Sequence, residues 1–378
     1  MSAADVVFWA CAAFVVYTYA GYPLVMAALA AMRKAPEPPA LGDADLPAAT
    51  IVMSAYNEAG RLPAKLDNLR ELHYPLDRVQ VMVVSDGSTD ETETILARRS
   101  DVRMVALPLR RGKAHALNVA LQQVSTPVVV FCDVRQDLDP DALRWLARDL
   151  ADPRIGVVSG ELSHRPSRTR TGQNVGLYWR YEKWIRKAES RLHSTVGATG
   201  ALYAMRTVDW RALREGAILD DFDNPMQVVR RGKRAILEPR AVAWDVVQED
   251  AAGERRRKIR TLSGNFQSFA DSPWLFSPLS NPVWFQFMSH KVFRLLVPYA
   301  LLAALAASLL AQGPVYRVAC ALQAVFYGLA AIGHGWPAAR RSRLVSLAHV
   351  FCELNLAAVW GLATFLRGRI DPRWEKTA

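Results

Sequence analysis

Residues 131–137, with the sequence FCDVRQD, place a carboxylate at the end of a predicted strand. A carboxylate at the carboxyl edge of a parallel sheet is well placed to hold a metal ion or a polar ligand. The residue two positions after Asp133, where a second carboxylate would help to chelate a cation, is Arg135. The segment therefore indicates a metal site with an unusual partner, a metal-free ligand site, or a loop without chemistry.

A second acidic group lies at residues 220–223. Asp220 and Asp221 are adjacent, and repulsion between two carboxylates raises the pKa of one of them, which suits a general base. The alternative is that this run caps the helix predicted over NPMQVVRRG, because Asp and Asn are favoured at the first position of a helix. Taken alone, the run favours the capping role.

The elements that must position these residues follow an alternating plan, which predicts parallel βαβ units. Apolar strands are expected at the starts of 50–60 and 79–92 and at 102–107 and 127–133. Helical leucine spacing or helix-start signals follow these strands at 61–72, 113–124 and 141–150. Ser88 and Glu91 have the spacing of a capping box.

Polar residues follow three of these strands at the edge where ligands of parallel sheets bind. They are Tyr56-Asn57-Glu58, Asp86-Gly87 and Asp133. One such carboxylate is simply explained as a turn or cap, but three on one edge predict a ligand site. The GxGxxG and Walker A patterns are absent, and RRGK at 110–113 has too few glycines to cradle a triphosphate. A nucleotide is still expected, held through its base by Asp86 and through its phosphates by Lys113 or a cation.

Six motifs in combination resemble the family-2 glycosyltransferases, which have the GT-A fold. They are SAYNE, SDGSTDET, GKAHALN, the strand ending in Asp133, GATGALYAMR (197–206) and ILDDFDNPMQVVRRGKRAILEP (218–239). The resemblance implies an α/β, Rossmann-like domain that binds a nucleotide sugar. One catalytic domain between an amino-terminal anchor and carboxyl-terminal helices is similar to the synthases of cellulose, hyaluronan and poly-N-acetylglucosamine.

The resemblance also implies roles for individual residues. Those implied to hold the donor base and ribose are Ala55, Tyr56, Glu58 and Asp86, with Lys113 near the donor. Asp133 would bind the donor diphosphate through a divalent cation, Mn²⁺ or Mg²⁺. Asp221 would be the catalytic base, with Asp220 beside it. The residues implied to shape the acceptor side are Gly197, Thr199 and Gly200.

Two departures from the family pattern matter. Arg135 replaces the second aspartate of the Asp-x-Asp motif and is expected to pair with phosphate or with Asp137. In the segment 254–267, Arg257, Arg260 and Thr261 stand where processive synthases have Gln-x-x-Arg-Trp. Arg257 and Arg260 are both expected on the donor side, and Arg260 still suits the donor diphosphate, because its planar fork matches pairs of oxygens. Thr261 removes the aromatic floor for the acceptor sugar, which argues against processive polymerisation. The alternative for the stripe 255–258 is contact with anionic lipid headgroups.

The helix predicted over 177–194 carries an apolar stripe that is expected to be core: Leu177, Tyr181, Trp184, Ala188 and Leu192. Tyr178 and Trp179 lie off that stripe and are the candidates for stacking on the acceptor. His290 and Lys291 end an aromatic segment and are expected to contact headgroups or phosphates.

Apolar patterning predicts a membrane protein of the cell inner (plasma) membrane. The expected parts are an anchor (1–34), the GT-A domain (35–280), an interfacial segment (281–291), membrane helices (292–366) and a basic tail (367–378). Arg33 and Lys34 place the GT-A domain in the cytoplasm. If all three carboxyl-terminal segments span, however, the basic tail lies on the far side, against the positive-inside tendency. Within the last segment, His349, Glu353 and Asn355 are costly in lipid, so they face a cavity or the segment does not span.

The net charge of +11 clusters at membrane edges and at 254–260, which favours lipid or phosphate partners over nucleic acid. The four cysteines are scattered without metal-ligand spacing, which argues against a disulfide framework or a zinc site.

The leading hypothesis is an inverting, metal-assisted glycosyltransferase that transfers a sugar to a growing glycan or a lipid-linked acceptor. A UDP-sugar is the expected donor. An export partner is a further option. The rivals are single-sugar transfer to a polyprenyl-phosphate or other lipid, and a membrane scaffold that binds nucleotide sugars without turnover.

Overall fold

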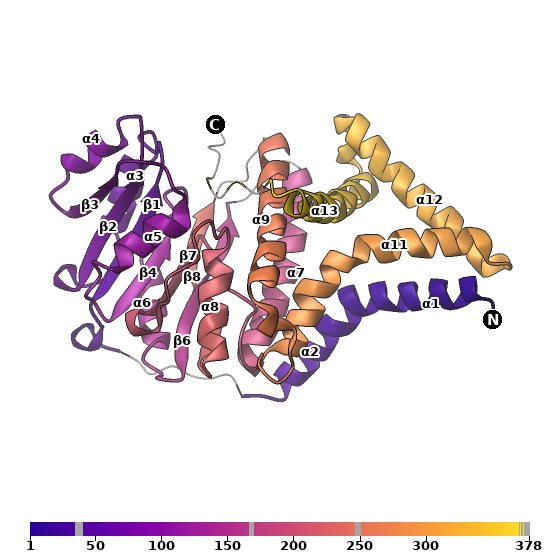
Figure 1. Cartoon of the computed structure of the whole chain (residues 1–378), viewed down its shortest axis with the longest axis horizontal. Helices are drawn as coiled ribbons and strands as arrows, with labels where there is room; N and C mark the ends of the chain where they lie inside the picture. Colours follow the sequence, from indigo (N-terminus) through magenta and orange to yellow (C-terminus); the bar gives the residue numbers. More distant parts are fainter. Residues whose placement is uncertain (35–40, 166–169, 246–250, 370, 372, 374–378) are drawn as a thin grey trace.

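The computed structural model describes residues 1–34, 41–165, 170–245, 251–369, 371 and 373. Within its helices, the side chains of 170–178, 251, 252 and 254 lie outside the description. An α/β domain occupies one side of the molecule, and long apolar helices extend from the other side (Figure 1).

An eight-stranded sheet forms the centre of the α/β domain, in the order β3-β2-β1-β4-β7-β6-β8-β5. Its strands are β1 (Ala49–Ala55), β2 (Val79–Asp86), β3 (Val102–Leu107), β4 (Val128–Cys132), β5 (Asp137–Leu138), β6 (Ile155–His164), β7 (Leu202–Arg206) and β8 (Arg234–Asp245). The first four strands are parallel to one another, and β7 is inserted antiparallel between β4 and β6. The predicted βαβ plan is confirmed, and the carboxyl ends of β1, β2 and β4 lie on one edge.

The helices of this domain are α3 (Leu62–Arg70), α4 (Thr92–Ala97), α5 (Lys113–Leu121), α6 (Ala142–Asp149), α7 (Arg170–Leu192), α8 (Asp220–Arg230) and α9 (Ala251–Asp271). Successive side chains of a strand point to opposite faces, so the sheet has a core on each side. On β1, Ile51 and Met53 join one buried cluster, while Val52 joins Phe131 and Tyr203 in the other. Both cores hold the strands rigid and so fix the positions of the residues at the strand ends.

The predicted capping box at Ser88 and Glu91 is wrong, because α4 begins one turn later than the pattern suggested. Glu91 holds the position before the helix and makes no side-chain cap. Asp90 instead accepts a hydrogen bond from the backbone N–H of Thr92 at 3.0 Å. The Ser88 hydroxyl accepts from the backbone N–H of Asn57 at 3.1 Å, so it links two loops of the ligand edge.

The apolar face of α7 differs by one position from the predicted stripe. Ile185 and Ala188 are buried, and Tyr181 and Leu192 pack against them, whereas Trp184 is 42% exposed. The side chain of Leu177 lies outside the described residues. The correction follows from helix geometry, because residues 181, 185, 188 and 192 share one face at spacings of three and four.

Four helical segments of the described chain are long and apolar enough to cross a membrane: Ala3–Ala31, Trp284–Leu310, Pro314–Gly335 and Arg343–Leu366. They contain α1 (Ala3–Val16), a π-helical turn (Tyr17–Gly21), α2 (Tyr22–Ala31), α10 (Trp284–Gln286), a second π-helical turn (Phe287–Val292), α11 (Phe293–Leu310), α12 (Pro314–Gly335) and α13 (Arg343–Leu366). Helices α1 and α11 run side by side away from the α/β domain, and α13 turns back to α9 (Figure 1). The second span begins inside the predicted interfacial segment.

Helices α2, α7 and α11 are joined by a buried polar network, the junction cluster. Its members are Tyr22, Glu182, Glu189, His290 and Arg294. The Tyr22 hydroxyl donates to Glu189 at 2.5 Å, and the two ring nitrogens of His290 lie 2.7 Å and 3.0 Å from Glu189 and Glu182. Arg294 donates to Glu182. The prediction that His290 contacts lipid headgroups is therefore wrong, because its ring is buried between two carboxylates of the α/β domain.

Candidate active site

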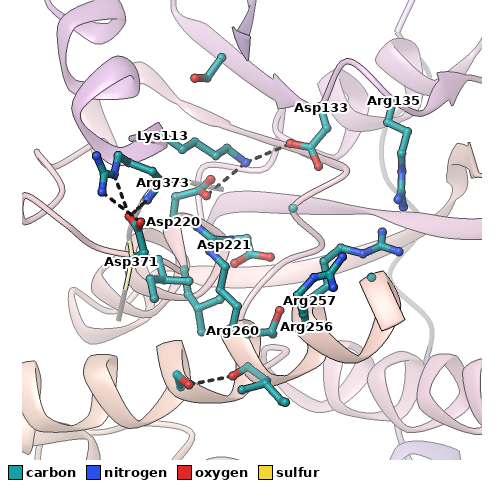
Figure 2. Close-up of a pocket in the computed structure, with 18 of the residues that line it drawn as sticks. Lys113, Asp133, Arg135, Asp220, Asp221, Arg256, Arg257, Arg260, Asp371 and Arg373 are labelled. Carbon is teal, nitrogen blue, oxygen red and sulfur yellow. Dashed lines mark hydrogen bonds and ion pairs between the residues drawn. The ribbon is translucent and has the colours of Figure 1, made fainter. Parts of the chain in front are cut away.

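A cavity of about 530 Å³ opens at the carboxyl edge of the sheet, where the sequence predicted a ligand site. Its polar lining comes from distant segments of the chain, among them those of Lys113 and Arg373 (Figure 2). The residues that carry the argument below are Glu58, Lys113, Asp133, Arg135, Gly200, Asp220, Asp221, Arg257, Arg260, Thr261, Arg369, Asp371 and Arg373.

Lys113, the first residue of α5, connects the acidic groups of the cavity. Its ammonium nitrogen lies 3.1 Å from Asp133 and 3.2 Å from Asp220 (Figure 2). Burial alone would lower the pKa of Lys113, but the Coulombic attraction of Asp133, Asp220 and Asp221 outweighs it and raises the pKa. The lysine is therefore charged, and it holds Asp133 and Asp220 close together across the cavity.

Asp220 and Asp221 form the first turn of α8, and Leu219 holds the position before the helix. The capping alternative is therefore wrong, because neither carboxylate occupies that position. Asp220 is buried and accepts a hydrogen bond from the Tyr203 hydroxyl at 2.9 Å. Lys113 and Tyr203 thus fix Asp220 in a position that leaves its neighbour facing the cavity.

Asp221 has the electrostatic surroundings of a base. Burial, reinforced by the adjacent charge of Asp220, raises the pKa of Asp221 to about 6. Its backbone carbonyl accepts a hydrogen bond from the N–H of Ala198 at 2.6 Å. A Cβ on Gly200 would lie 2.8 Å from a carboxylate oxygen of Asp221, so glycine is needed for this close approach. Gly197 supports the same loop with φ of +93°, a conformation that favours glycine.

Arg135 lines the cavity, but its guanidinium is engaged by a residue that the sequence did not indicate. It donates to Asp245 at the end of β8, which also accepts from Gln136 at 3.1 Å. Asp137 pairs instead with Arg165 at 2.7 Å, so the predicted Arg135–Asp137 pair is wrong. The reason is topological, because β5 pairs with β8 and so brings Asp245 beside Arg135. The segment 131–137 is therefore an ordered part of the cavity wall.

The residues predicted to hold the nucleotide base and ribose make contacts within the protein. Asp86 is buried, and its two carboxylate oxygens accept hydrogen bonds from the backbone N–H groups of Arg111 and Gly112, both at 2.8 Å. The guanidinium carbon of Arg110 lies 3.8 Å from the centroid of the Tyr56 ring, and Ala55 is buried. Glu58 lines the cavity directly. The roles of these residues toward a nucleotide stay predictions.

Helix α9 brings Arg257, Arg260 and Thr261 to the cavity, opposite Lys113 (Figure 2). On the predicted acceptor side, the Thr199 hydroxyl accepts from Arg186 at 2.6 Å. Trp179 packs at a tilt against His164, with ring centroids 5.6 Å apart, and it is not among the residues that line this cavity. The side chain of Tyr178 lies outside the described residues.

Three tail residues, Arg369, Asp371 and Arg373, also line the cavity, and no sequence signal pointed to them. Arg373 donates to Asp371 at 3.0 Å (Figure 2). Tyr203 and Asp245 were missed as well. Tyr203 lies in the motif GATGALYAMR without a distinguishing signal of its own, and Asp245 lies 110 residues from its partner.

Comparisons with known proteins agree with this geometry. Residues 50–210 match the family model described as Glycosyl transferase family 2. A poly-beta-1,6-N-acetyl-D-glucosamine synthase of Staphylococcus aureus is 25% identical over 231 residues, which are 59% of this chain and 56% of that protein. The Staphylococcus epidermidis enzyme of the same name is 24% identical over 236 residues, 60% of this chain and 56% of that protein. The chain thus matches little more than half the length of these relatives.

The solved structure of a mannosyltransferase from Pyrobaculum calidifontis, in complex with GDP-Man and Mn²⁺, superposes with a TM-score of 0.73. The two sequences are 24% identical, and the superposition covers 96% of this chain and 99% of the mannosyltransferase chain. The fold is the GT-A fold, and the comparisons together support a glycosyltransferase. The region 50–210 matches the model of glycosyl transferase family 2, and the chain resembles the polysaccharide synthases named above.

Proposed function

We propose that the protein is a membrane-bound, inverting glycosyltransferase that transfers a sugar from a nucleotide sugar, a UDP-sugar in the first instance, to a growing glycan of the cell envelope or exterior. The observation that carries this proposal is Asp221, a carboxylate with a raised pKa that faces the cavity containing Lys113 and Asp133. A single base opposite a cation-lined leaving-group site is what a direct displacement requires.

In this mechanism, Asp221 removes the proton of an acceptor hydroxyl as its oxygen forms a bond to the anomeric carbon of the donor. The bond from that carbon to the diphosphate oxygen breaks on the opposite side, which inverts the configuration. Lys113 and Arg260 neutralise charge on the departing nucleoside diphosphate. General-base assistance of this kind contributes a rate factor of about 10²–10⁴.

Asp133 is suited to a divalent cation. Lys113 engages only one of its oxygens, and the side chain remains 43% exposed toward the cavity. Mg²⁺ is commonly bound by one or two carboxylates together with substrate phosphates, so a single aspartate is sufficient. Bound there with the donor, a cation would stabilise charge on the diphosphate. Arg135 is held by Asp245 and leaves room for it. The Mn²⁺ in the Pyrobaculum mannosyltransferase complex supports this assignment.

The tail supports a particular membrane topology. Arg369, Asp371 and Arg373 lie at the catalytic cavity, so the end of α13 and the α/β domain share one side of the membrane. Along its length α13 contacts α9, through the Ser263 hydroxyl, 3.1 Å from the Gly361 carbonyl, and through stacked Phe266 and Phe365. In this proposal α13 lies against the catalytic domain at the cytoplasmic face of the inner membrane. The basic tail then satisfies the positive-inside tendency.

A second candidate is transfer of a single sugar to a polyprenyl-phosphate or other lipid. Thr261 favours it, because this residue lines the cavity where a processive synthase would present an aromatic floor. Product analysis separates the two candidates, since a polymerase yields a ladder of lengths and a single-transfer enzyme yields one lipid-linked product.

The test is nucleotide release by the full chain in detergent with lipid extract, across UDP-, GDP- and other sugar donors, with Mg²⁺ or Mn²⁺ and with EDTA. Release from one donor that EDTA stops is the expected result. Release that survives EDTA would contradict the metal role of Asp133, and would assign charge neutralisation to Lys113 and the arginines. Binding of a donor without release under any acceptor condition would favour the scaffold alternative.

A further inference from the structure

Two histidines and a glutamate meet where α12 packs against α13, on the membrane side of the molecule. His349 and Glu353 lie four residues apart and therefore on one face of α13. His334 reaches them from the last turn of α12, and its Nδ1 lies 3.2 Å from a carboxylate oxygen of Glu353. Ligand atoms from all three residues lie within 4.8 Å of one another. Among the described residues, this is the single group of three or more potential metal ligands gathered so closely.

The packing of the two helices is adapted to this meeting. A Cβ on Gly333 would lie 2.9 Å from the Cβ of His349, so glycine is what permits the close approach. His349 is 9% exposed, whereas the His334 side chain is 65% exposed, so the group is open to solvent on one side.

An ordinary ion pair does not account for the whole group. Arg255 of α9 lies 4.0 Å from Glu353, which is at the limit of a salt bridge. Arg255 and His334 together explain the position of the Glu353 carboxylate. They do not explain why the buried His349 lies close to the same carboxylate.

We propose that His334, His349 and Glu353 bind a divalent transition-metal ion, with zinc as the preferred occupant. Two imidazole nitrogens and one carboxylate are a zinc ligand set, and a water completes the tetrahedron. With zinc–ligand bonds of about 2.0–2.2 Å, ligand atoms lie roughly 3.3 Å apart. The pair formed by His334 and Glu353 already meets this spacing, and side-chain rotation of His349 brings in the third ligand.

This site differs chemically from the catalytic cavity, where carboxylates and phosphates favour Mg²⁺ or Mn²⁺. Zinc would fasten α12 to α13, and α13 in turn packs against α9, the helix that carries Arg257 and Arg260. The scattered cysteines of the sequence argued against zinc, but this site contains no cysteine. The three ligands here come from two helices, and no short motif encodes such a group.

The test uses the full chain without an affinity tag, purified in detergent, stripped with a chelator and dialysed into excess Mg²⁺. Zinc is then titrated, and bound zinc is measured by elemental analysis together with the melting temperature. We expect one equivalent of zinc and a zinc-dependent rise in melting temperature. His334→Ala and Glu353→Gln should each weaken zinc binding at least about tenfold and abolish that rise.

His334 is the preferred first substitution because its side chain is mostly exposed, and melting without zinc verifies that the variant is folded. His73→Ala is the matched control, since His73 is an equally exposed histidine paired with a carboxylate at 3.1 Å. Asp133→Asn should also retain the zinc. The proposal is overturned if the unmodified chain binds no zinc, or if His334→Ala and Glu353→Gln bind it as the unmodified chain does. Neither readout depends on sugar transfer.

Discussion

Two acidic groups of this molecule have opposite electrostatics, although each combines carboxylates with nearby cations. In the junction cluster, burial alone would raise the pKa of Glu182, but Arg294 and His290 are in direct contact and lower it well below its usual range. In the cavity, Lys113 contacts Asp133 and Asp220, and Asp221 is left with a raised pKa of about 6. A carboxylate saturated with cations fastens helices together, whereas one beside another carboxylate is available to accept a proton.

The comparison predicts that the two groups fail in different ways when they are altered. The largest expected effect is on catalysis. Asp221→Asn removes the proposed base and should lower the rate of transfer about 10²- to 10⁴-fold, while donor affinity and melting temperature stay close to those of the unmodified chain. Single-turnover transfer and donor titration measure the two quantities separately. Transfer at the original rate would show that Asp221 is not the base.

In the junction cluster, the expected loss is in stability. Glu182→Ala leaves Arg294 and His290 buried without one carboxylate, which typically costs about 3–5 kcal/mol. Chemical unfolding in detergent should show this decrease, with transfer per folded molecule little changed. Asp141→Ala, which removes an exposed partner of His73, is the control and should change the free energy of unfolding by less than about 1 kcal/mol. Equal losses in the two variants would contradict the structural role of the junction.

A smaller effect is expected from Gly200→Ala. The added methyl group would lie 2.8 Å from a carboxylate oxygen of Asp221 and so must displace the base. Displacement of a catalytic group by about 1 Å can cost up to about a hundredfold, and we expect a decrease of roughly ten- to a hundredfold in kcat. Gly60→Ala is the control, since a Cβ there meets nothing within 4 Å and its φ is not positive. Equal kcat values for both variants would show that the space at Gly200 does not control the position of Asp221.

The mildest perturbation is pH. Because the pKa of Asp221 is raised to about 6, its carboxylate is protonated below that pH and cannot accept the acceptor's proton. The rate of transfer should therefore be constant above about pH 7 and fall about tenfold per pH unit below about pH 6. The residual activity of Asp221→Asn should not show this fall in rate below about pH 6. A rate that is constant down to pH 5 in the unmodified chain would contradict the assignment.

Much of the cavity was predictable from local signals. Strand patterning placed Asp133 and Asp86 at the ends of parallel strands, because alternation and burial are properties of short segments. The resemblance then implied a role for Asp221. What Asp86 contacts was not predictable, since both of its oxygens are used by the backbone of the loop at 110–112. Local patterns also misjudged helix starts, and α8 begins at the acidic pair instead of after it.

The parallel βαβ plan, the edge on which Asp133 lies and the apolar segments could all be predicted, since each follows from residues close together in the chain. Three contacts could not: Asp245 with Arg135, the tail with the cavity, and His334 with Glu353. These contacts join distant segments. They depend on strand order and helix packing, which arise from the whole core and not from any one segment.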